Sequence, residues 1–233
     1  MIPLYWLLII IFIVLIIITI ISILIIHLSQ NQLKNKNRLE YAGMGEGYIK
    51  PIIMDNLLTR EKCQEIMEYC EDKLFESEVV GGKHKDIRNS QQYWIPKTHP
   101  LIKPLFEQLS STFNIPYDHA EDLQVVRYRP GQYYNEHHDS CCDNNDKCYE
   151  FVKRGGQRML TVLIYLNNDF EEGATYFPNL QLQLKASPGS AIVFHPLAIN
   201  SNKCHPLALH AGLPVKSGEK WVANIWFRQN VFL

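Results

Sequence analysis

The stretch Arg127-Tyr-Arg-Pro-Gly-Gln-Tyr-Tyr-Asn-Glu-His-His-Asp139 ends with a histidine and an aspartate two residues apart. Side chains of a β-strand alternate between its two faces, so His137 and Asp139 are expected to point to the same side. Two such side chains can hold one metal ion from one side. The pair alone is a weak signal, because most His/Asp pairs in proteins are surface or turn residues.

A third ligand is required, and His210 is the candidate far downstream. Two histidines and one carboxylate on one side of a metal, with open positions opposite, form the facial triad of non-haem Fe(II) oxygenases. The open positions can admit a co-substrate and O2, which a closed structural site would not. His138 is the middle residue of the motif and is expected to face away from the metal.

From residue 122 onward, short β-type runs alternate with glycine, proline and asparagine. Helices followed by a run of strands favour an α+β, mainly β fold: a double-stranded β-helix (jelly roll) with supporting N-terminal helices. Regular alternation of strand and helix is absent, which argues against a doubly wound fold. We expect strands at residues 123–128, 132–138, 159–166, 174–177, 180–184, 191–194, 206–210 and 221–227.

Two amphipathic helices are expected before these strands. Thr59 is a plausible N-cap for the first, and the second is expected to begin near Thr98 and Pro100. Cys63 and Cys70 lie two helical turns apart on the apolar stripe of the first helix. We interpret them as buried small hydrophobic residues rather than as a functional pair.

The first part of the chain is strongly apolar. Residues 2–26 carry no charge, and about 37 Å of helix is enough to cross a hydrocarbon core of about 30 Å. A basic start and a small-residue cleavage site are not evident, which argues against a cleaved signal peptide. We therefore expect an uncleaved transmembrane signal-anchor at residues 1–28, a linker at 29–50 and one catalytic domain at 51–233, with its core at 120–233.

Composition limits the function classes. The formal net charge of −1 argues against a nucleic-acid binder with a basic surface. The orientation of the anchor is ambiguous, because Lys34, Lys36 and Arg38 follow it and would favour a cytosolic domain.

Several further motifs follow residues 127–139 in order: Gly-Gly-Gln-Arg (155–158), Thr-Val-Leu-Ile-Tyr-Leu (161–166), Glu-Gly-Ala-Thr-Tyr-Phe-Pro (172–178), His-Ala-Gly-Leu-Pro-Val (210–215) and Lys-Trp-Val-Ala-Asn-Ile-Trp (220–226). Together they resemble the catalytic domain of collagen-type prolyl 4-hydroxylases, which belong to the Fe(II)/2-oxoglutarate-dependent dioxygenases. The resemblance spans about residues 51–233. Several motifs in the right order are specific, where any one would be weak.

The resemblance implies a set of site residues and cofactors. The cofactors would be Fe(II), 2-oxoglutarate as co-substrate, O2 and ascorbate. The substrate would be a proline-rich or collagen-like peptide, hydroxylated at C4 of proline, and a protein partner subunit is unknown. The implied metal ligands are His137, Asp139 and His210; the implied co-substrate contacts are Lys220, Tyr128 and Thr175; the implied peptide contacts are Tyr134, Arg158 and Trp226.

The chemistry agrees with Lys220 independently of the resemblance. 2-Oxoglutarate chelates iron through its keto acid, and its far carboxylate then needs a fixed cation at the bottom of the pocket. A buried charge is tolerated only when it is paired. A lysine supplies a point charge on a long stem.

Alternatives stay open at this point. The chain could hydroxylate another residue or substrate, or it could be an inactive jelly-roll binding protein. The loop that contains Cys141, Cys142 and Cys148 could be a zinc site with His137 and His138, although its spacing does not match common zinc ligand patterns. A disulfide from Cys148 to Cys141 or to Cys142, or free thiols, fits the spacing better.

The same cysteine loop bears on localisation. Exposed thiols beside an oxidising site would be prone to oxidation, whereas a disulfide would be inert. The resemblance also favours the endoplasmic reticulum lumen over the cytosol. We therefore expect a single-pass membrane protein with a lumenal catalytic domain and at least one disulfide that involves the loop at 141–148.

Overall fold

The computed structural model describes Tyr5 and residues 19–22, 47–78, 86–143 and 145–233. The chain falls into two units, Met1–Glu46 and Gly47–Leu233, and the fold below is that of the second. Most of the expected anchor (1–28) and linker (29–50) lies outside the described residues. Among the residues that are described, no helix has the length and apolar character needed to cross a membrane. The anchor therefore stays a prediction.

The larger sheet has seven strands in the order β1-β10-β6-β13-β4-β3-β2. Neighbouring strands are antiparallel throughout. In sheet order the strands are Ile52–Met54, Ala191–Phe194, Arg158–Tyr165, Lys220–Arg228, Leu123–Tyr128, Gln91–Ile95 and Phe75–Glu76. The last strand in the sequence, β13, therefore lies between β6 and β4 near the middle of the sheet.

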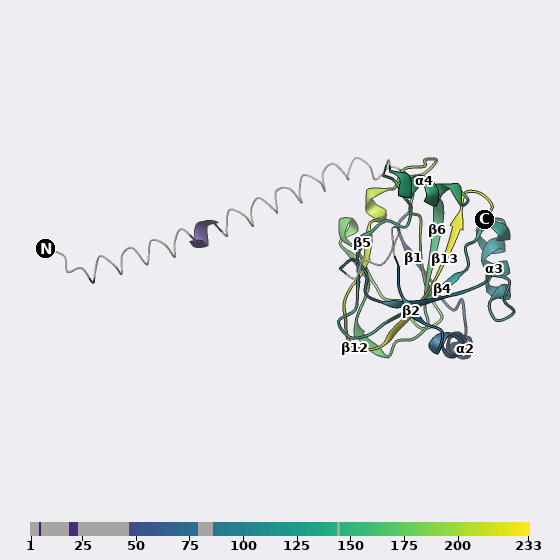
Figure 1. The fold of residues 1–233 in the computed structure, drawn as a ribbon, viewed down its shortest axis with the longest axis horizontal. Helices are drawn as coiled ribbons and strands as arrows, with labels where there is room; N and C mark the ends of the chain where they lie inside the picture. Colours follow the sequence, from purple (N-terminus) through teal and green to yellow (C-terminus); the bar gives the residue numbers. More distant parts are fainter. Residues whose placement is uncertain (1–4, 6–18, 23–46, 79–85, 144) are drawn as a thin grey trace. The chain divides into compact units, whose positions relative to one another are not determined.

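Two helices cover one face of this sheet (Figure 1). Helix α2 (Arg60–Glu71) and helix α3 (Lys103–Phe113) each bury an apolar stripe against it. On β13 the residues alternate, as a strand's period of two requires. Trp221, Ala223, Ile225 and Phe227 belong to the core under the helices, whereas Lys220, Val222, Asn224 and Trp226 line a cavity on the other face.

A smaller sheet packs against that second face. It has the order β5-β11-β8-β9, with strands Tyr134–His137, His210–Gly212, Thr175–Phe177 and Leu182–Leu184. A further pair joins β7 (Phe170–Glu172) to β12 (Val215–Gly218). Apolar residues of both main sheets form one cluster, including Val126, Leu163, Tyr165, Phe177 and Phe194. The predicted mainly β fold of antiparallel sheets with helices on one side is confirmed.

Local predictions were confirmed at several places. Strands β4 and β10 have the predicted bounds. Thr59 caps α2, and its hydroxyl accepts a hydrogen bond of 3.2 Å from the backbone N–H of Lys62. Cys63 and Cys70 are buried and free, as predicted.

Other predictions were wrong. Residues 206–210, predicted as a strand, contain the 3-10 helix η3 (Pro206–Ala208), because Nδ1 of His205 accepts a hydrogen bond from the backbone N–H of Leu207. The cysteine-rich segment, predicted as a loop, contains helix α4 (Asp146–Lys153), which Asn145 caps. Helix α3 begins at Lys103, later than predicted.

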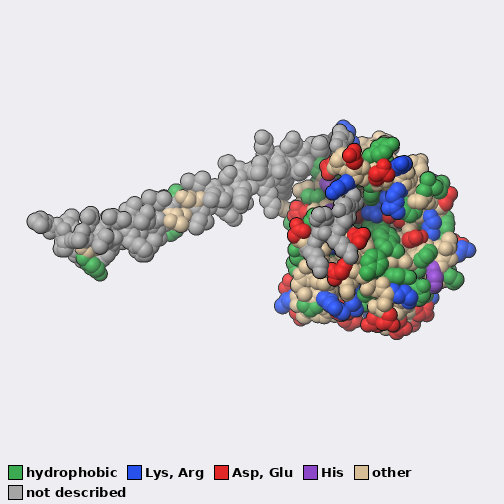
Figure 2. Space-filling view, viewed as in Figure 1, with side chains coloured by type: hydrophobic (Ala, Val, Ile, Leu, Met, Phe, Trp, Pro, Cys, Tyr) green, Lys and Arg blue, Asp and Glu red, His purple; other side chains and the backbone are tan. Residues whose placement is uncertain are grey.

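The surface of residues 47–233 carries charges of both signs. Figure 2 shows acidic and basic side chains intermixed over the visible described face, without an extended basic area there. This agrees with the near-zero net charge of the chain.

Candidate active site

A cavity of about 890 Å³ lies between the inner face of the large sheet and the small sheet. Its lining comes from β3, β4, β6 and β13 on one side and from β5, β8 and β11 on the other. The structure brings together every site residue predicted from the sequence: Tyr128, Tyr134, His137, Asp139, Arg158, Thr175, His210, Lys220 and Trp226.

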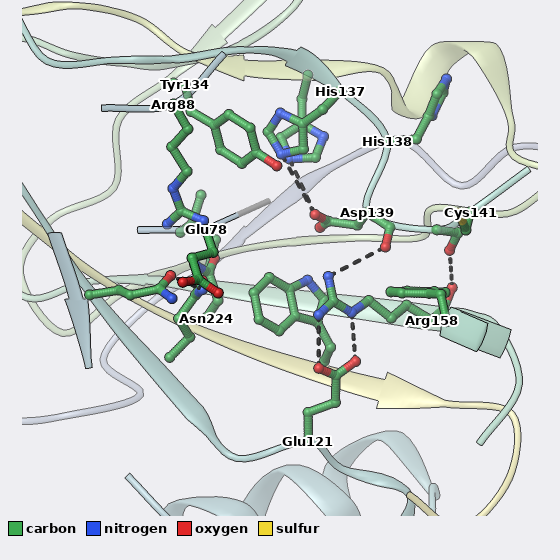
Figure 3. Close-up of a pocket in the computed structure, with 18 of the residues that line it drawn as sticks. Glu78, Arg88, Glu121, Tyr134, His137, His138, Asp139, Cys141, Arg158 and Asn224 are labelled. Carbon is green, nitrogen blue, oxygen red and sulfur yellow. Dashed lines mark hydrogen bonds and ion pairs between the residues drawn. The ribbon is translucent and has the colours of Figure 1, made fainter. Parts of the chain in front are cut away.

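The three predicted metal ligands converge at one point of this cavity. His137 ends β5 and His210 begins β11, and the two are directly paired in the antiparallel register. Oδ1 of Asp139 lies 3.7 Å from Nε2 of His137 and 3.8 Å from Nε2 of His210. The three ligand atoms lie within 4.8 Å of one another. Figure 3 shows the ring of His138 turned away from this group, as predicted.

Hydrogen bonds to the backbone fix the tautomers of both histidines. Nδ1 of His137 lies 2.7 Å from the carbonyl oxygen of Asn135, and Nδ1 of His210 lies 3.1 Å from that of Ala208. A carbonyl oxygen can only accept, so each Nδ1 carries the proton and each Nε2 keeps its lone pair. Burial, and next the neighbouring His210, lower the pKa of His137 well below its usual value, which favours the neutral ring.

Asp139 is held as a carboxylate. Burial would raise its pKa, but His210, His137, Arg158 and the hydrogen bond from Thr161 together lower it to about 2. The hydroxyl of Thr161 donates to Oδ2 at 2.7 Å, so Oδ1 is the atom that faces the histidines.

These residues fit a divalent transition metal. Two imidazole nitrogens and one carboxylate oxygen, all electron-pair donors, face one another without a proton donor between them among the described residues. Such a group is repulsive unless a cation lies at its centre. Imidazole and carboxylate in a 2-His-1-carboxylate set suit Fe(II), as predicted from the sequence.

Lys220 lies elsewhere in the same cavity and is only 3% exposed. Its Nζ donates a hydrogen bond of 2.7 Å to the carbonyl oxygen of Gly173. Glu172 and Gly173 both have φ near +62°, in the left-handed region, and this turn precedes β8 with its buried Thr175. Lys220 is paired in register with Tyr128 across β13 and β4.

The side-chain nitrogen of Lys220 lies near two aromatic rings. Its Nζ lies 5.4 Å and 5.1 Å from the ring centroids of Tyr128 and Tyr165, and no carboxylate among the described residues forms an ion pair with it. Burial, and next the nearby Lys185, lower the pKa of Lys220 to about 7. A buried ammonium of this kind suits an anionic ligand. Tyr165, whose hydroxyl lies 2.9 Å from that of Thr175, packs behind these residues and was not predicted as a site residue.

The residues predicted to contact a peptide lie beside the metal ligands. The ring of Tyr134 stacks on that of His137, with centroids 3.5 Å apart. The guanidinium of Arg158 lies 3.6 Å from the ring centroid of Trp226. Nε1 of Trp226 is buried and has no hydrogen-bond partner among the described residues. The guanidinium of Arg88 lies over the ring of Tyr134, 4.7 Å from its centroid.

Arg158 is held in place by a buried carboxylate that sequence reasoning missed. Glu121 accepts hydrogen bonds from Arg158 at 2.6 and 2.8 Å and from Nε of Arg228 at 2.8 Å, and the first two are drawn in Figure 3. Burial would raise the pKa of Glu121, but the two guanidinium groups lower it. Glu121 and Arg158 lie far apart in the sequence, so no local pattern indicates the pairing.

A row of amides also lines the cavity. Nδ2 of Asn224 donates to Gln124 at 3.1 Å, and Nε2 of Gln124 donates to Gln92 at 2.7 Å. The three residues come from the adjacent strands β13, β4 and β3. Gln124 and Gln92 are buried polar residues of these strands, and their polarity was the signal available in the sequence.

The cysteines form two disulfides at the rim of the cavity: Cys141–Cys148 and Cys142–Cys204. The first is one of the two pairings left open by the spacing, and the second was not predicted. Because all the cysteines of the loop are oxidised, the zinc alternative for this loop is wrong.

Comparisons with known proteins point in one direction. The family model of the 2OG-Fe(II) oxygenase superfamily matches residues 123–228. A protein of Acanthamoeba polyphaga mimivirus, whose name places it among the prolyl 4-hydroxylases, is 58% identical over 205 residues, or 88% of this chain and 85% of that protein. Prolyl 4-hydroxylase 1 of Arabidopsis thaliana is 31% identical, over 76% of this chain and 68% of that protein.

A solved structure also matches this chain in fold and in sequence. The viral collagen prolyl hydroxylase vCPH from Paramecium Bursaria Chlorella virus-1, determined as a 2OG complex, matches with a TM-score of 0.60 and 33% identity. The match covers 76% of this chain and 95% of that chain.

Proposed function

We propose that this protein is a peptidyl-proline 4-hydroxylase. The chain belongs to the 2OG-Fe(II) oxygenase superfamily and, within it, to the prolyl 4-hydroxylases. Enzymes of this family are dioxygenases that use Fe(II), 2-oxoglutarate and O2, with ascorbate as the typical reductant. In the proposed reaction, C4 of a proline ring gains a hydroxyl group while 2-oxoglutarate is converted to succinate and CO2.

One observation carries the proposal: the three converging ligand atoms share a single cavity with the buried Lys220, whose ammonium group can bind an anion. A structural metal site would not need an unpaired buried ammonium in the same cavity. A metal-chelating dicarboxylate needs both, since one end binds the metal and the other needs a cation.

His137, Asp139 and His210 would hold the iron. When bound there with 2-oxoglutarate and O2, Fe(II) supplies the oxidant for the C–H bond. The chain's own contribution is geometric: the carbonyls of Asn135 and Ala208 orient the two imidazoles, and Thr161 orients the carboxylate.

Lys220, Thr175 and Tyr128 would hold the far carboxylate of 2-oxoglutarate. Lys220 supplies the charge and Thr175 a hydroxyl group, and all three side chains are buried. A buried site of this kind excludes water and strengthens the ion pair.

Tyr134, Arg158 and Trp226 would contact the peptide. Aromatic faces suit proline rings, and a proline-rich segment in an extended helix leaves its carbonyl groups without internal partners. The guanidinium of Arg158 and the unpaired N–H of Trp226 are donors for such carbonyls. This supports a proline-rich or collagen-like peptide as the substrate.

We further propose that residues 1–28 anchor the protein in the endoplasmic reticulum membrane, with the catalytic domain at 51–233 in the lumen. The uncharged apolar run supports the anchor, and the two disulfides support an oxidising compartment.

The test uses the full chain in detergent solution with Fe(II), 2-oxoglutarate and ascorbate. Collagen-like and other proline-rich peptides are compared with matched peptides that carry alanine at each proline. We expect succinate and peptide 4-hydroxyproline to form in equal amounts, and neither above background with the alanine peptides.

The other outcomes separate the alternatives. Hydroxylation at a different residue, assigned by mass spectrometry, would make this a dioxygenase with another target. Peptide binding without succinate formation would indicate an inactive binding protein.

A further inference from the structure

The two disulfides at the rim of the cavity differ in the sequence distance that they bridge. Cys141–Cys148 joins residues seven positions apart in the sequence, within one segment. Cys142–Cys204 joins residues 62 positions apart. Cys142 follows the metal ligand Asp139 by three residues, and Cys204 precedes the metal ligand His210 by six.

The backbone pairing between these segments stops at the metal ligands. Strand β5 ends at His137 and β11 begins at His210, and a register shift separates this pair from the next, Tyr134 with Gly212. Asp139 therefore lies beyond the β-ladder. From that point on, the Cys142–Cys204 bridge is a covalent link between the segment after His137 and the segment before His210.

The contacts around the bridge keep the two segments close. The backbone N–H of Cys204 lies 2.8 Å from Sγ of Cys142, and Sγ of Cys204 lies 3.4 Å from the carbonyl oxygen of Ser140, next to Asp139. The hydroxyl of Ser140 donates to the carbonyl oxygen of Arg158 at 2.6 Å, which ties this segment to β6.

The segment before His210 is attached to a different part of the fold. Nδ2 of Asn179, in the 3-10 helix η2 (Pro178–Leu180), donates to the carbonyl oxygen of Pro206 at 2.8 Å. The two ligand-bearing segments thus rest on separate supports, β6 and η2.

We propose that the Cys142–Cys204 disulfide is a positioning bridge, which sets the separation of Asp139 from His210 and so raises the metal affinity of the site. With the bridge, folding has already brought the ligands together. Without it, metal binding must also order the two segments, and part of the binding energy is lost. Cys141–Cys148 does not cross between the segments, so it should lack this effect. The proposal rests on the proposed metal site.

The test compares two double variants of the full chain, Cys142→Ser/Cys204→Ser and, as the matched control, Cys141→Ser/Cys148→Ser. Mn(II) is titrated into each protein without iron, and free Mn(II) is followed by its EPR signal. We expect at least about tenfold weaker Mn(II) binding in the first variant, the size typical for loss of a group that orients metal ligands, and a change within about twofold in the control. Thermal unfolding of both variants is measured in parallel.

The control separates positioning from general stability. Equal losses of Mn(II) affinity in both variants, or a larger loss in the control, would overturn the proposal. If Cys142→Ser/Cys204→Ser fails to fold, the control variant is treated with a phosphine, which cleaves its remaining disulfide to two thiols and becomes the phosphine oxide. Mn(II) affinity should then fall by the same factor, and unchanged affinity counts against the bridge.

Failure of the metal site itself gives a different result. A wild-type chain that does not bind Mn(II), or that binds it equally well with His137→Ala, would remove the proposed metal site. Tight wild-type binding that survives loss of the bridge would remove only the positioning role.

Discussion

The hydroxyl of Thr161 donates a hydrogen bond of 2.7 Å to Oδ2 of Asp139. Thr161 belongs to β6, which is paired with β10 on one side and with β13 on the other. Asp139 itself lies past the end of β5 and outside any strand. The central sheet therefore helps to orient the carboxylate of this candidate metal ligand, whose own segment is a loop.

Alanine at a candidate metal ligand should abolish turnover and weaken metal binding. A three-ligand site has no redundancy, so His137→Ala, Asp139→Ala or His210→Ala should each remove measurable succinate formation and weaken Mn(II) binding at least about tenfold. His138→Ala is the matched control, because its ring faces away from the group (Figure 3). Full activity in any ligand variant, in metal-controlled buffer, would exclude that residue from the triad.

Lys220→Ala should raise the KM for 2-oxoglutarate far more than the KM for the peptide. Removal of one partner of a buried charge pair costs about 3–5 kcal/mol, which corresponds to a change in KM of more than about a hundredfold. Lys216→Ala is the control, because Lys216 is exposed and its Nζ pairs instead with Glu171 at 3.5 Å. An unchanged KM in Lys220→Ala would mean that another cation, such as Arg158, holds the carboxylate.

Binding of 2-oxoglutarate should take up protons above neutral pH. Burial lowers the pKa of Lys220 from 10.5 to about 7, so at pH 8 the side chain is mostly neutral, and an anion at Nζ should restore its charge. Calorimetry with Mn(II) present, in buffers of different ionisation enthalpy, should give an uptake that approaches one proton at pH 8 to 9 and vanishes below pH 6.

The same shift sets the sign of the effect on stability. The folded pKa lies below the unfolded one, so the unfavourable contribution of Lys220 to the free energy of unfolding is complete below about pH 7 and disappears as the pH rises to about 10.5.

Lys220→Arg is the control for the calorimetry, because arginine stays charged and should show no proton uptake. Equal uptake in both proteins would assign the proton to another group.

Glu121→Gln should destabilise the fold. The change leaves Arg158 and Arg228 buried without their shared carboxylate, at a cost of about 3–5 kcal/mol in the free energy of unfolding. The change in the free energy of unfolding is measured by urea denaturation. Glu107→Gln removes the carboxylate of an exposed pair with Lys103 and should change stability by less than about 0.5 kcal/mol. Similar effects of the two changes would mean that the buried network contributes little.

Residues 47–233 should be protected from protease in sealed microsomes and digested once detergent is added. Without reductant, cysteine alkylation of the unfolded chain should label Cys63 and Cys70 only, because the other cysteines are in disulfides. Digestion without detergent, together with labelling of all the cysteines, would place the domain in the cytosol, as the charges of Lys34, Lys36 and Arg38 favour.

Sequence reasoning identified the three candidate metal ligands, which the structure brings together, and it identified most strands, because strands depend on local pattern. Turn residues bracket β4 and β10 and gave their bounds. Strand periodicity predicted that His137 and Asp139 point to one side, although β5 ends at His137 and Asp139 lies outside any strand. Their union with His210 needed the resemblance, since pairing in register between β5 and β11 is a long-range property.

The rest of the site depends on contacts between distant residues. Glu121 meets Arg228 across 107 positions, and Cys142 meets Cys204 across 62. No periodicity encodes such pairs. Helix α4 was missed for a different reason: the N-cap signal of Asn145 was present, but the cysteines around it were interpreted as a loop.

The place of β13 between β4 and β6 has a consequence for biosynthesis. Strands β4 and β6 each pair with β13, and this strand lies at residues 220–228, the last of the sheet to be translated. A nascent chain that has not reached residue 228 therefore presents two unpaired apolar strand edges. Such edges invite mispairing with other chains, and pairings between distant residues form slowly. The sheet must thus close after most of the domain has been made, and a chaperone that shields β4 and β6 until then would raise the yield of native enzyme.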